Sequence, residues 1–391
     1  MLLRRIELQD VRSYARAALD LSAGVTVLVG PNAQGKTNLL EAVLRAGTGA
    51  SHRVSSDVPL VRDGAEMGII RTVLETDAGR RRTVELEVAS GRRTRTRVDG
   101  QDVRRSTEAL GVLRVVLFAP EDVAIVRGDP SERRRFLDDL LSQRRPAFAA
   151  ARSEYDRVLK QRNHLLKQAR GLSSSAAEAA SATLDVWTDQ LVQHATSVVA
   201  ARIAALHALA GPVDRFYRDL ADRPEPVRLG YRSTADLDVV GDPGRGVPER
   251  EPIEEALRRA LAEARDDERQ RGVTLVGPHR DDVELTIGDL PARGYSSHGE
   301  AWSLALSLKL STFEVLAEVG DRPVVLLDDV FAELDETRRA RLAGACDRFD
   351  QVLVTAAVEA DVPLRGAMVD VRLDGGQSSL HPRPHAAGGA A

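Results

Sequence analysis

Residues Gly30-Pro31-Asn32-Ala33-Gln34-Gly35-Lys36-Thr37 match the phosphate-loop pattern G-x-x-x-x-G-K-[ST] in full. The β-branched run Val25–Val29 precedes this loop, and the periodic segment Asn38–Leu44 follows it. This order predicts a buried strand, a tight loop and a helix. In such a setting backbone N–H groups surround phosphates at the positive end of the helix, Lys36 reaches the β- and γ-phosphates, and the Thr37 hydroxyl binds Mg²⁺. The sequence therefore predicts a nucleoside triphosphate site to which every residue of the loop contributes.

The composition limits where and how the protein can act. A chain of 391 residues can form two or three lobes, and its net charge of −4 means that any contact with nucleic acid must come from a local basic patch. Nearly all the positive charge is arginine, since the only lysines are Lys36, Lys160, Lys167 and Lys309. The single cysteine, Cys346, excludes an internal disulfide and a cysteine-based metal cluster. We recognise neither a signal peptide nor an apolar run of membrane-spanning length, so we expect a cytoplasmic protein without membrane contact.

The character of the sequence changes along the chain. Residues 1–125 are rich in strand patterns, 126–271 in long helical patterns, and 272–375 in strands and helices, whereas 376–391 has a composition typical of disorder. We therefore predict a discontinuous α/β head, formed by the first and third segments, with a helical lobe inserted between them.

The predicted elements follow from apolar periodicity and turn residues. The expected strands cover Leu3–Val11, Val25–Val29, Ile69–Leu74, Thr83–Val88, Arg93–Val98, Val115–Phe118, Val273–Val276, Val283–Ile287, Val324–Leu327 and Gln351–Thr355. The expected helices cover Glu132–Arg170, Leu184–Leu209, Ile253–Arg271 and Gly299–Val319, with another after Asp335 and with breaks at 173–183 and 236–252.

A second motif fits the metal side of a nucleotide site. Val324–Leu327 is a continuous apolar strand that ends in Asp328 and Asp329, as expected where a parallel strand delivers carboxylates to the Mg²⁺ of a bound nucleotide. We expect Asp328 to assist the metal through water, and Asp329 to orient or deprotonate the attacking water. A strand that simply ends in an acidic turn is the alternative, and the presence of the phosphate loop favours the nucleotide interpretation.

The spacing of these motifs distinguishes among nucleotide-binding folds. The acidic strand comes about 290 residues after Lys36, far more than one compact βαβ array needs, so a segment has been inserted. Ser297-His-Gly299-Glu300 opens the predicted helix that precedes the acidic strand. This order resembles that of ABC-type ATPases, whose S-x-G-[QE] segment contacts the γ-phosphate held by the opposite subunit. Ser297 and Gly299 are therefore candidate contacts, although a plain helix cap explains the same residues.

Two further positions resemble the same group of ATPases. Ala332–Asp335 resembles the D-loop that follows their acidic strand, so Asp335 is a candidate contact. Thr355 falls near the position where transporters carry a switch histidine, which leaves the γ-phosphate sensor open.

With these pieces in place, the chain resembles the RecF family, a relative of the SMC group of ABC ATPases, over nearly its whole length. The opening Val11-Arg12-Ser-Tyr14 fits the first strand of this group, where Arg12 is a candidate nucleotide contact. The insertion is too interrupted for the coiled-coil arms of SMC proteins, so a compact second lobe is expected. The resemblance rests on the blocks Phe118–Asp122, Gly128–Asp138, Gly277–Asp282, Ser296–Glu300 and Leu327–Asp335.

The resemblance implies a function that the residues alone do not. A RecF-like protein would be a weak, DNA-stimulated ATPase that dimerises around ATP and Mg²⁺. It would bind duplex DNA at gaps and at junctions between single strands and duplex. With RecO and RecR it would help RecA loading, in DNA repair, replication and SOS induction. The alternatives are the ATPase subunit of a transporter, an SMC-like nuclease subunit, and a DNA clamp that does not hydrolyse ATP.

A row of arginines supplies a candidate DNA surface. Arg93, Arg95 and Arg97 alternate along one predicted strand, so their side chains would project from one face of a hairpin. Such a row can follow phosphates without reading bases, but a solvated sheet face explains it equally well. The run Arg133–Arg135 is the fallback surface. The motif Gly277–Asp282 contains a histidine and an arginine that could sense nucleotide or DNA, or could hold a turn together.

Overall fold

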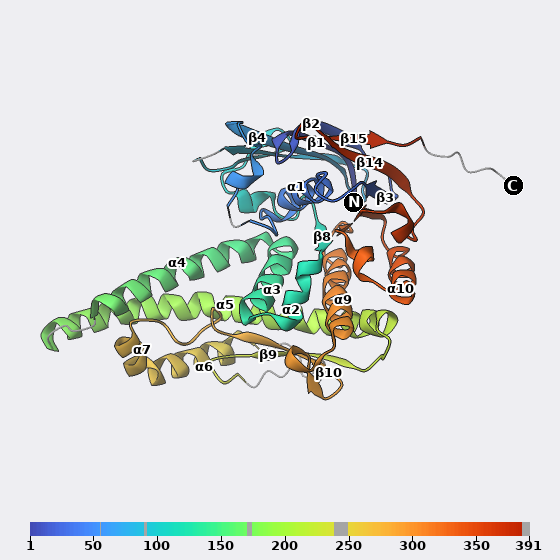
Figure 1. Ribbon diagram of the computed structural model, residues 1–391. Helices are drawn as coiled ribbons and strands as arrows, with labels where there is room; N and C mark the ends of the chain where they lie inside the picture. Colours follow the sequence, from blue (N-terminus) through green and yellow to red (C-terminus); the bar gives the residue numbers. More distant parts are fainter. Residues whose placement is uncertain (55, 90–91, 170–173, 238–248, 385–391) are drawn as a thin grey trace. The chain divides into compact units, whose positions relative to one another are not determined.

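The computed structural model describes residues 1–54, 56–89, 92–169, 174–237 and 249–384. The chain forms two compact units (Figure 1). Unit 1 contains Met1–Asp122, Asp219–Asp222 and Leu306–Ala391, so it is assembled from both ends of the chain, and unit 2 contains Val123–Arg218 and Arg223–Ala305. Residues 272–305 belong to unit 2, whereas the sequence placed them in the head, because a strand of this segment pairs with a strand of the insertion.

The first sheet of unit 1 has six strands with antiparallel neighbours. Alternate residues of one central strand, β5, are buried, which gives the sheet an apolar face. The predicted strands at β1, β4 and β5 are confirmed, β2 is not among the predicted strands, and β6 starts at Arg95 instead of Arg93. In spatial order the strands are β2 (Tyr14–Asp20), β1 (Leu2–Val11), β4 (Met67–Glu75), β5 (Arg81–Ala89), β6 (Arg95–Val98) and β7 (Gln101–Asp102).

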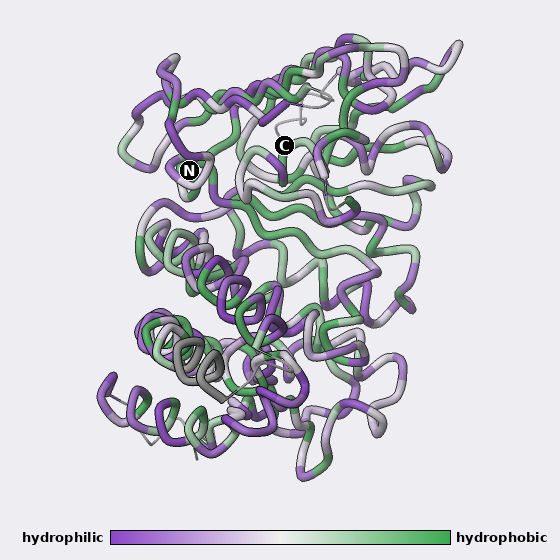
Figure 2. Tube along the Cα trace, turned by 90° about the vertical axis from the view of Figure 1, so that its left-hand side faces the viewer, coloured by the Kyte–Doolittle hydropathy of each residue, from purple (hydrophilic) through white to green (hydrophobic). Residues whose placement is uncertain are grey.

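The second sheet of unit 1 leads into the phosphate loop. All neighbours from β14 to β8 are parallel, and β15 pairs antiparallel with β14. Every residue of β8, β12 and β13 is buried, which explains their apolar sequences. Figure 2 shows hydrophobic strands running through the centre of this region. The spatial order is β15 (Gln377–Pro382), β14 (Ala367–Asp374), β3 (Gly24–Val29), β13 (Gln351–Ala356), β12 (Val324–Leu327) and β8 (Val115–Phe118).

Helix α1 (Lys36–Thr48) joins the two sheets of unit 1 into one core. It contacts β1, β4 and β5 of the first sheet, and β8 and β13 of the second. One buried apolar cluster contains Leu39 and Val43 of α1, Leu86 of the first sheet and Leu353 of the second. Helix α10 (Glu336–Cys346) makes the connection between the parallel strands β12 and β13.

The C-terminal segment of unit 1 is ordered further than the sequence predicts. Residues 376–391 were expected to be disordered, yet Gln377–Pro382 form β15, in which Leu380 pairs with Val371 of β14. Leu380 packs against the core cluster, and this apolar contact stabilises the strand. Residues 385–391 lie outside the described part of the chain.

Unit 2 combines helices with a three-stranded sheet. The sheet order is β11 (Leu290–Pro291), β10 (Asp282–Ile287) and β9 (Val227–Arg232). The insertion is therefore not purely helical, because β9 within it pairs with β10 beyond it. The helices are α2 (Ala124–Arg127), α3 (Pro130–Arg144), α4 (Pro146–Ala169), α5 (Ser174–Leu220), α6 (Arg250–Glu263), α7 (Arg265–Arg271), α8 (Ala292–Tyr295) and α9 (His298–Ala317), of which α5 and α9 continue into unit 1.

Two helical predictions for unit 2 are corrected by the structure. The expected helix Glu132–Arg170 is split at Arg145, because Pro146 disfavours a helical conformation in the residue before it. A break was expected at 173–183, but the chain is helical from Ser174 onwards. The many alanines of this stretch favour a helix. Residue 173 lies outside the described residues.

The expected strand Val273–Val276 is absent from the structure, although this segment is fully described. Two of its backbone N–H groups donate to side chains, and that of Val273 donates to Glu268 O, none of them to a neighbouring strand. Thr274 N donates to Asn163 Oδ1 at 2.7 Å, and Leu275 N donates to Glu268 Oε1 at 2.7 Å. An apolar run can thus be buried by helices without belonging to a sheet.

One helical stretch, Ala182–Leu220, is long and apolar enough to cross a membrane by length and composition alone, which the sequence analysis did not anticipate. Of its most apolar window, 56% is buried inside the protein, and Val198 and Val199 are completely buried. This burial is typical of a core helix, which passes the same test of length and composition.

Candidate nucleotide-binding site

The phosphate loop connects β3 to α1, as the sequence predicts, and two of its glycines are required by close packing. Gly35 has a φ of 106°, and a Cβ placed on it would lie 2.5 Å from Ser378 Oγ. A Cβ on Gly30 would lie 2.3 Å from Val371 O. Only glycine avoids both clashes, and the backbone between these residues is left open for an incoming anion.

Side chains from distant parts of unit 1 support this loop. Ser378 Oγ donates to Gln34 O at 2.7 Å, and Tyr14 OH donates to Gly35 O at 3.0 Å. Ser378 Oγ also lies 2.7 Å from Ser13 Oγ. The C-terminal hairpin β14–β15 and the turn between β1 and β2 therefore hold the loop in shape, a role that the sequence analysis did not assign to either.

Lys36 directs its ammonium group back over the loop. The side chain is 6% exposed, and its Nζ donates to Gly30 O at 2.6 Å and to Pro31 O at 2.9 Å. Burial lowers the pKa of Lys36, and the carboxylates of Asp329 and Asp328 oppose that shift. The result is a partly desolvated cation at the centre of a phosphate-sized turn.

The structure brings Thr37 and Asp328 together, although they come from opposite ends of the chain. Thr37 Oγ1 donates to Asp328 Oδ1 at 3.0 Å, and Thr355 Oγ1 donates to the same oxygen at 2.6 Å. Burial raises the pKa of Asp328, while the hydrogen bonds from Thr355 and Thr37 lower it. A hydroxyl and a carboxylate side by side are the pair that Mg²⁺ uses when phosphate oxygens and water complete its shell.

Asp329 follows at the same edge of the sheet in an uncommon conformation. Its φ is 51°, and its backbone N–H donates to Thr355 Oγ1 at 2.8 Å. Its Oδ1 is buried and has no hydrogen-bond partner within the described residues. Such a left-handed backbone and an unsatisfied carboxylate oxygen are features that persist at functional sites.

These residues fit a magnesium–nucleotide complex better than a resident metal. Within the described residues, no group of three or more His, Cys, Asp or Glu side chains could hold a metal ion by itself. Thr37 and Asp328 supply only part of a shell, so the metal would arrive with the phosphates. The loop with its two required glycines, the Lys36 ammonium and the unpaired Oδ1 of Asp329 all suit the binding of Mg²⁺ together with a nucleotide.

Arg12 lies in the turn between β1 and β2 and is held by a carboxylate. Its φ is 52°, and its guanidinium donates to Glu41 at 2.9 and 2.8 Å. Burial raises the pKa of Glu41, but hydrogen bonds from Arg12 and Ser51 outweigh it, and the net shift is downward. Glu41 was not among the candidates predicted from the sequence. It is completely buried on α1 and fixes the position of Arg12.

His52 is a further candidate that the sequence analysis missed. Its Nδ1 is buried without a hydrogen-bond partner among the described side chains and backbone. Burial lowers the pKa of His52, while the charges of Glu41 and Asp328 raise it. A histidine on an irregular segment gives no pattern in sequence, so only its place near these carboxylates identifies it.

The remaining candidate contacts occupy helix starts. Ser297 is exposed just before α9, where its Oγ accepts from Glu300 N at 3.2 Å and its own N–H donates to Glu300 Oε2 at 2.8 Å. This reciprocal pair is a capping box, and Gly299 lies in the first turn of the same helix. Asp335 caps α10 by accepting from Arg338 N at 2.9 Å. Each residue thus has a structural role, and the exposed side chain of Ser297 is open to a further partner.

The arginine row is largely engaged in ion pairs. Arg95 pairs with Asp102, and Arg97 contacts both Asp102 at 3.0 Å and Glu85 at 2.6 Å. Arg93 lies before β6, is exposed, and has no ion pair in the described ranges. Alternation along one strand had suggested that the three side chains are equivalent. The structure shows that they are not.

The fallback surface Arg133–Arg135 is corrected by the structure. Arg133 is 3% exposed and pairs with Asp282 at 2.7 Å. Arg134 donates to Asp281 O at 2.8 Å. Only Arg135 is exposed, so the run does not form a basic surface, because two of its side chains hold the start of α3 to the Gly277–Asp282 motif.

The Gly277–Asp282 motif forms a buried polar network in unit 2. His279 Nδ1 lies 2.6 Å from Tyr155 OH, and burial lowers the pKa of His279 to about 4. Asp281 accepts from Tyr231 OH at 2.8 Å and from Thr234 Oγ1 at 2.8 Å. A neutral histidine and a fully paired aspartate are typical of structure, which favours the turn-holding interpretation.

Comparison with known proteins agrees with this fold. The family model described as RecF/RecN/SMC N terminal domain matches residues 2–377. The Smc head bound to the C-winged helix domain of ScpA shares the fold with a TM-score of 0.56 and 16% identity, over 99% of this chain and 98% of that chain. The phosphate loop, acidic strand and discontinuous head thus define an ATPase head of the SMC class, and the predicted fold class is confirmed.

Similarity to one branch of that class is much stronger. The DNA replication and repair protein RecF of Kineococcus radiotolerans is 50% identical over 375 residues, which is 93% of this chain and 95% of the relative. The solved recombination mediator protein RecF-ATPrS has a TM-score of 0.86 and 28% identity, over 97% of this chain and 98% of that chain. The solved RecF-ATP has a TM-score of 0.82 and 28% identity, over 94% and 96%. The chain belongs to the RecF family.

Proposed function

We propose that this protein is an ATP-dependent DNA-binding recombination mediator. The observation that carries the proposal is the meeting of Lys36, Thr37 and Asp328 at one complete phosphate loop in a chain of the RecF family. A related RecF solved with ATP is described as a recombination mediator in the RecFOR pathway, which supports the same role for this chain.

Each group at the loop has its own role in nucleotide binding. Backbone N–H groups of Asn32–Thr37 and the Lys36 ammonium hold the phosphates of ATP, and Gly30 and Pro31 shape the loop around them. Thr37 and Asp328 hold Mg²⁺, which supplies positive charge against the phosphate oxygens when it is bound. Asp329 orients and deprotonates the attacking water with its unpaired carboxylate oxygen. Arg12, positioned by Glu41, contacts the nucleotide beside the loop.

ATP acts as a switch between a monomer and a homodimer. Ser297 and Gly299 at the start of α9, and Asp335 at the start of α10, contact the nucleotide held by a second copy of the chain. Hydrolysis is weak, is stimulated by DNA, and releases the dimer. This arrangement suits a protein that must stay on DNA until loading is complete.

The DNA partner is held through its phosphates. A groove of about 310 Å³ is lined by Arg93, Arg95 and Arg104, of which Arg93 and Arg104 have no ion pair within the described ranges. Arginines in a row bind the backbone without reading bases, which suits duplex DNA at gaps and at junctions with single strands. In the cytoplasm, with RecO and RecR, the protein helps RecA loading in repair, replication and SOS induction.

Sedimentation with and without ATP and gapped duplex DNA tests the proposal. We expect the unaltered protein to dimerise with ATP and to carry DNA with it, and Lys36→Met to do neither while remaining folded. Arg258→Met is the control, because it removes one exposed positive charge from α6, far in sequence from the loop. If Lys36→Met binds ATP with the same affinity as the unaltered protein, the proposal is wrong.

The alternatives are separated by simple measurements. A clamp that does not hydrolyse ATP would show no turnover in a single-turnover assay with saturating gapped DNA. A transporter subunit would require a membrane partner, and an SMC-like nuclease subunit would require a long arm. In the described part of the insertion, the helices are interrupted by loops and by β9, which disfavours an arm.

A further inference from the structure

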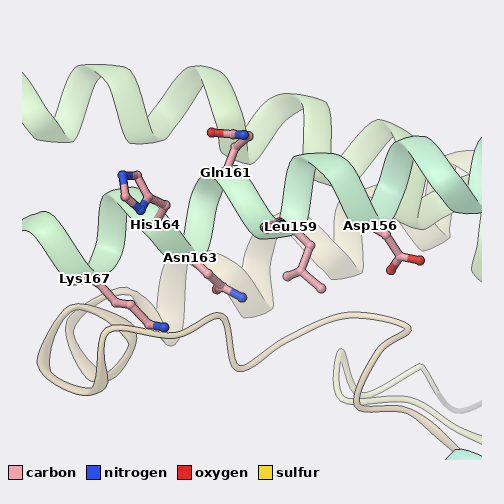
Figure 3. Close-up of a pocket in the computed structure, with 7 residues that line it drawn as sticks. Asp156, Leu159, Gln161, Asn163, His164 and Lys167 are labelled. Atoms are coloured by element: carbon pink, nitrogen blue, oxygen red, sulfur yellow. The ribbon is translucent and has the colours of Figure 1, made fainter. Parts of the chain in front are cut away.

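Helix α4 has exposed basic side chains on its surface, of which His164 and Lys167 are labelled in Figure 3. Lys160, His164 and Lys167 are exposed at positions i, i+4 and i+7, so they lie one above another on the same side of the helix. We call this row the α4 face. The buried residues Arg162 and Leu166 lie on the opposite side of α4, which packs against the rest of unit 2.

The charges of the α4 face are not neutralised. Lys309 pairs with Asp122 at 3.1 Å, and Lys36 is bound by its own loop, but Lys160 and Lys167 have no ion pair or hydrogen bond within the described residues. Nearby acidic residues of α4 are already engaged. Glu154 pairs with Arg157 at 2.7 Å, and Asp156 pairs with Arg152.

A hollow lies beside the row. It has a volume of about 550 Å³, and its lining includes Leu159, Lys160, Asn163, His164 and Lys167. Asn163 Oδ1 accepts from Thr274 N at 2.7 Å, which fixes the orientation of the amide and leaves its NH₂ group to donate elsewhere. Asp156 also lines the hollow, but its carboxylate pairs with Arg152, so the two lysines leave a surplus of positive charge beside the hydrogen-bond donors.

We infer that the α4 face binds the sugar–phosphate backbone of DNA. This inference rests on the proposed function and assigns part of its DNA contact to unit 2. The row extends about 10 Å along the helix, at about 1.5 Å per residue, which matches roughly three nucleotide steps of about 3.4 Å. Lysine ammonium groups on flexible stems donate to phosphates without reading bases.

An acidic protein segment is the competing occupant of the α4 face. Protein interfaces depend on aromatic or large apolar anchors that fill pockets. The lining of this hollow contains one apolar side chain, Leu159, and no aromatic residue within the described part of the chain. Because the lining is more charged than apolar, a phosphate backbone suits the α4 face better than a protein segment does.

The double variant Lys160→Gln/Lys167→Gln tests the inference. Binding of the full-length protein with ATP to fluorescent gapped duplex DNA is measured over a range of salt concentrations. Each lost phosphate contact lowers the log–log salt slope by about 0.9, so we expect a decrease of roughly 2 per subunit and weaker binding at low salt. ATP affinity stays unchanged, because neither lysine belongs to the phosphate loop.

The matched control is Arg258→Gln/Arg265→Gln, which removes the same charge from exposed arginines that are paired with Asp189 and Asp185. A slope that is unchanged in the lysine variant, or that falls equally in both variants, overturns the inference. If the lysine variant keeps its DNA affinity but loses binding to a polyglutamate peptide, the face serves an acidic protein segment and the inference is again overturned. Failure of the unaltered protein to bind DNA would instead overturn the proposed function itself.

Discussion

Thr355 Oγ1 donates a hydrogen bond of 2.6 Å to Asp328 Oδ1 and accepts one of 2.8 Å from Asp329 N. Thr355 is completely buried at the end of β13, which lies beside β12 in the parallel sheet. One hydroxyl therefore contacts the carboxylate of Asp328 and the backbone of Asp329. We therefore propose that Thr355 is a positioning residue, which holds the Asp328 carboxylate and the Asp329 backbone in place.

Replacing Thr355 by valine keeps the shape of the side chain and removes the hydroxyl. We expect Thr355→Val to lower the rate of ATP hydrolysis about ten-fold or more, because small displacements of catalytic groups are costly, with little change in ATP affinity. Thr355→Ser keeps the hydroxyl and should retain most of the activity. Steady-state hydrolysis and binding of a fluorescent ATP analogue measure the two effects. Equal rates for the valine and serine variants would show that the hydroxyl has no such role.

Asp329→Asn tests the assignment of the base. The variant should bind ATP with Mg²⁺ as the unaltered protein does, because Thr37, Lys36 and Asp328 are unchanged. Hydrolysis should slow by about 100-fold, within the range that general bases contribute, so the ATP-bound dimer should persist. Size-exclusion chromatography after ATP addition follows the dimer over time. Normal turnover would move the catalytic role to another carboxylate, such as Glu121 or Asp335.

Ser297→Arg separates ATP binding from assembly. The variant should bind ATP as a monomer, because in the proposed dimer Ser297 contacts the nucleotide of the other subunit and a bulky side chain would block that approach. It also loses the cap on Glu300 N, at a cost of about 1 kcal/mol. Ser297→Ala loses the same cap without adding bulk and serves as the control. An ATP-induced dimer of Ser297→Arg as stable as that of Ser297→Ala would contradict the role across subunits.

The triple variant Arg93→Ala/Arg95→Ala/Arg97→Ala tests the arginine row. If all three side chains contact DNA, the log–log salt slope should fall by roughly 2–3 per subunit, while ATP binding survives. Asp102→Asn should increase the available positive charge, because the Asp102 carboxylate pairs with both Arg95 and Arg97. Release of these arginines should strengthen DNA binding. If neither variant changes the affinity or the slope, the row is only a solvated face.

His279 predicts a dependence of stability on pH. Burial lowers its pKa to about 4, well below the ordinary value of about 6.5 in the unfolded chain. Between these values the unfolded state binds more protons, so the free energy of unfolding falls as the pH decreases from about 6.5 to about 4, by up to about 3 kcal/mol. Urea unfolding at several pH values measures this.

Tryptophan fluorescence suits the measurement, because both tryptophans, Trp187 and Trp302, lie in unit 2 with His279. His279→Gln keeps a polar side chain near Tyr155 and cannot titrate. Its unfolding free energy should therefore change less between pH 7 and pH 5. A pH dependence identical to that of the unaltered protein would show that another group is responsible.

The amino-acid sequence by itself determined the phosphate loop, its flanking strand and helix, and the acidic strand. Each of these features is a contiguous stretch of sequence, so the information for it lies in neighbouring residues. The buried strands β3, β8, β12 and β13 were predictable for a related reason, since strands buried on both faces are largely apolar.

Only the tertiary structure decided which distant residues meet. Thr355 reaches Asp328 through the register of β13 on β12. Ser378 reaches Gln34 from β15, a strand within the segment that composition alone marked as disordered. The charges of Arg95 and Arg133 were visible in the sequence, but their neutralisation by Asp102 and Asp282 was not. Such pairings depend on packing between elements far apart in the chain, and local pattern contains no record of that packing.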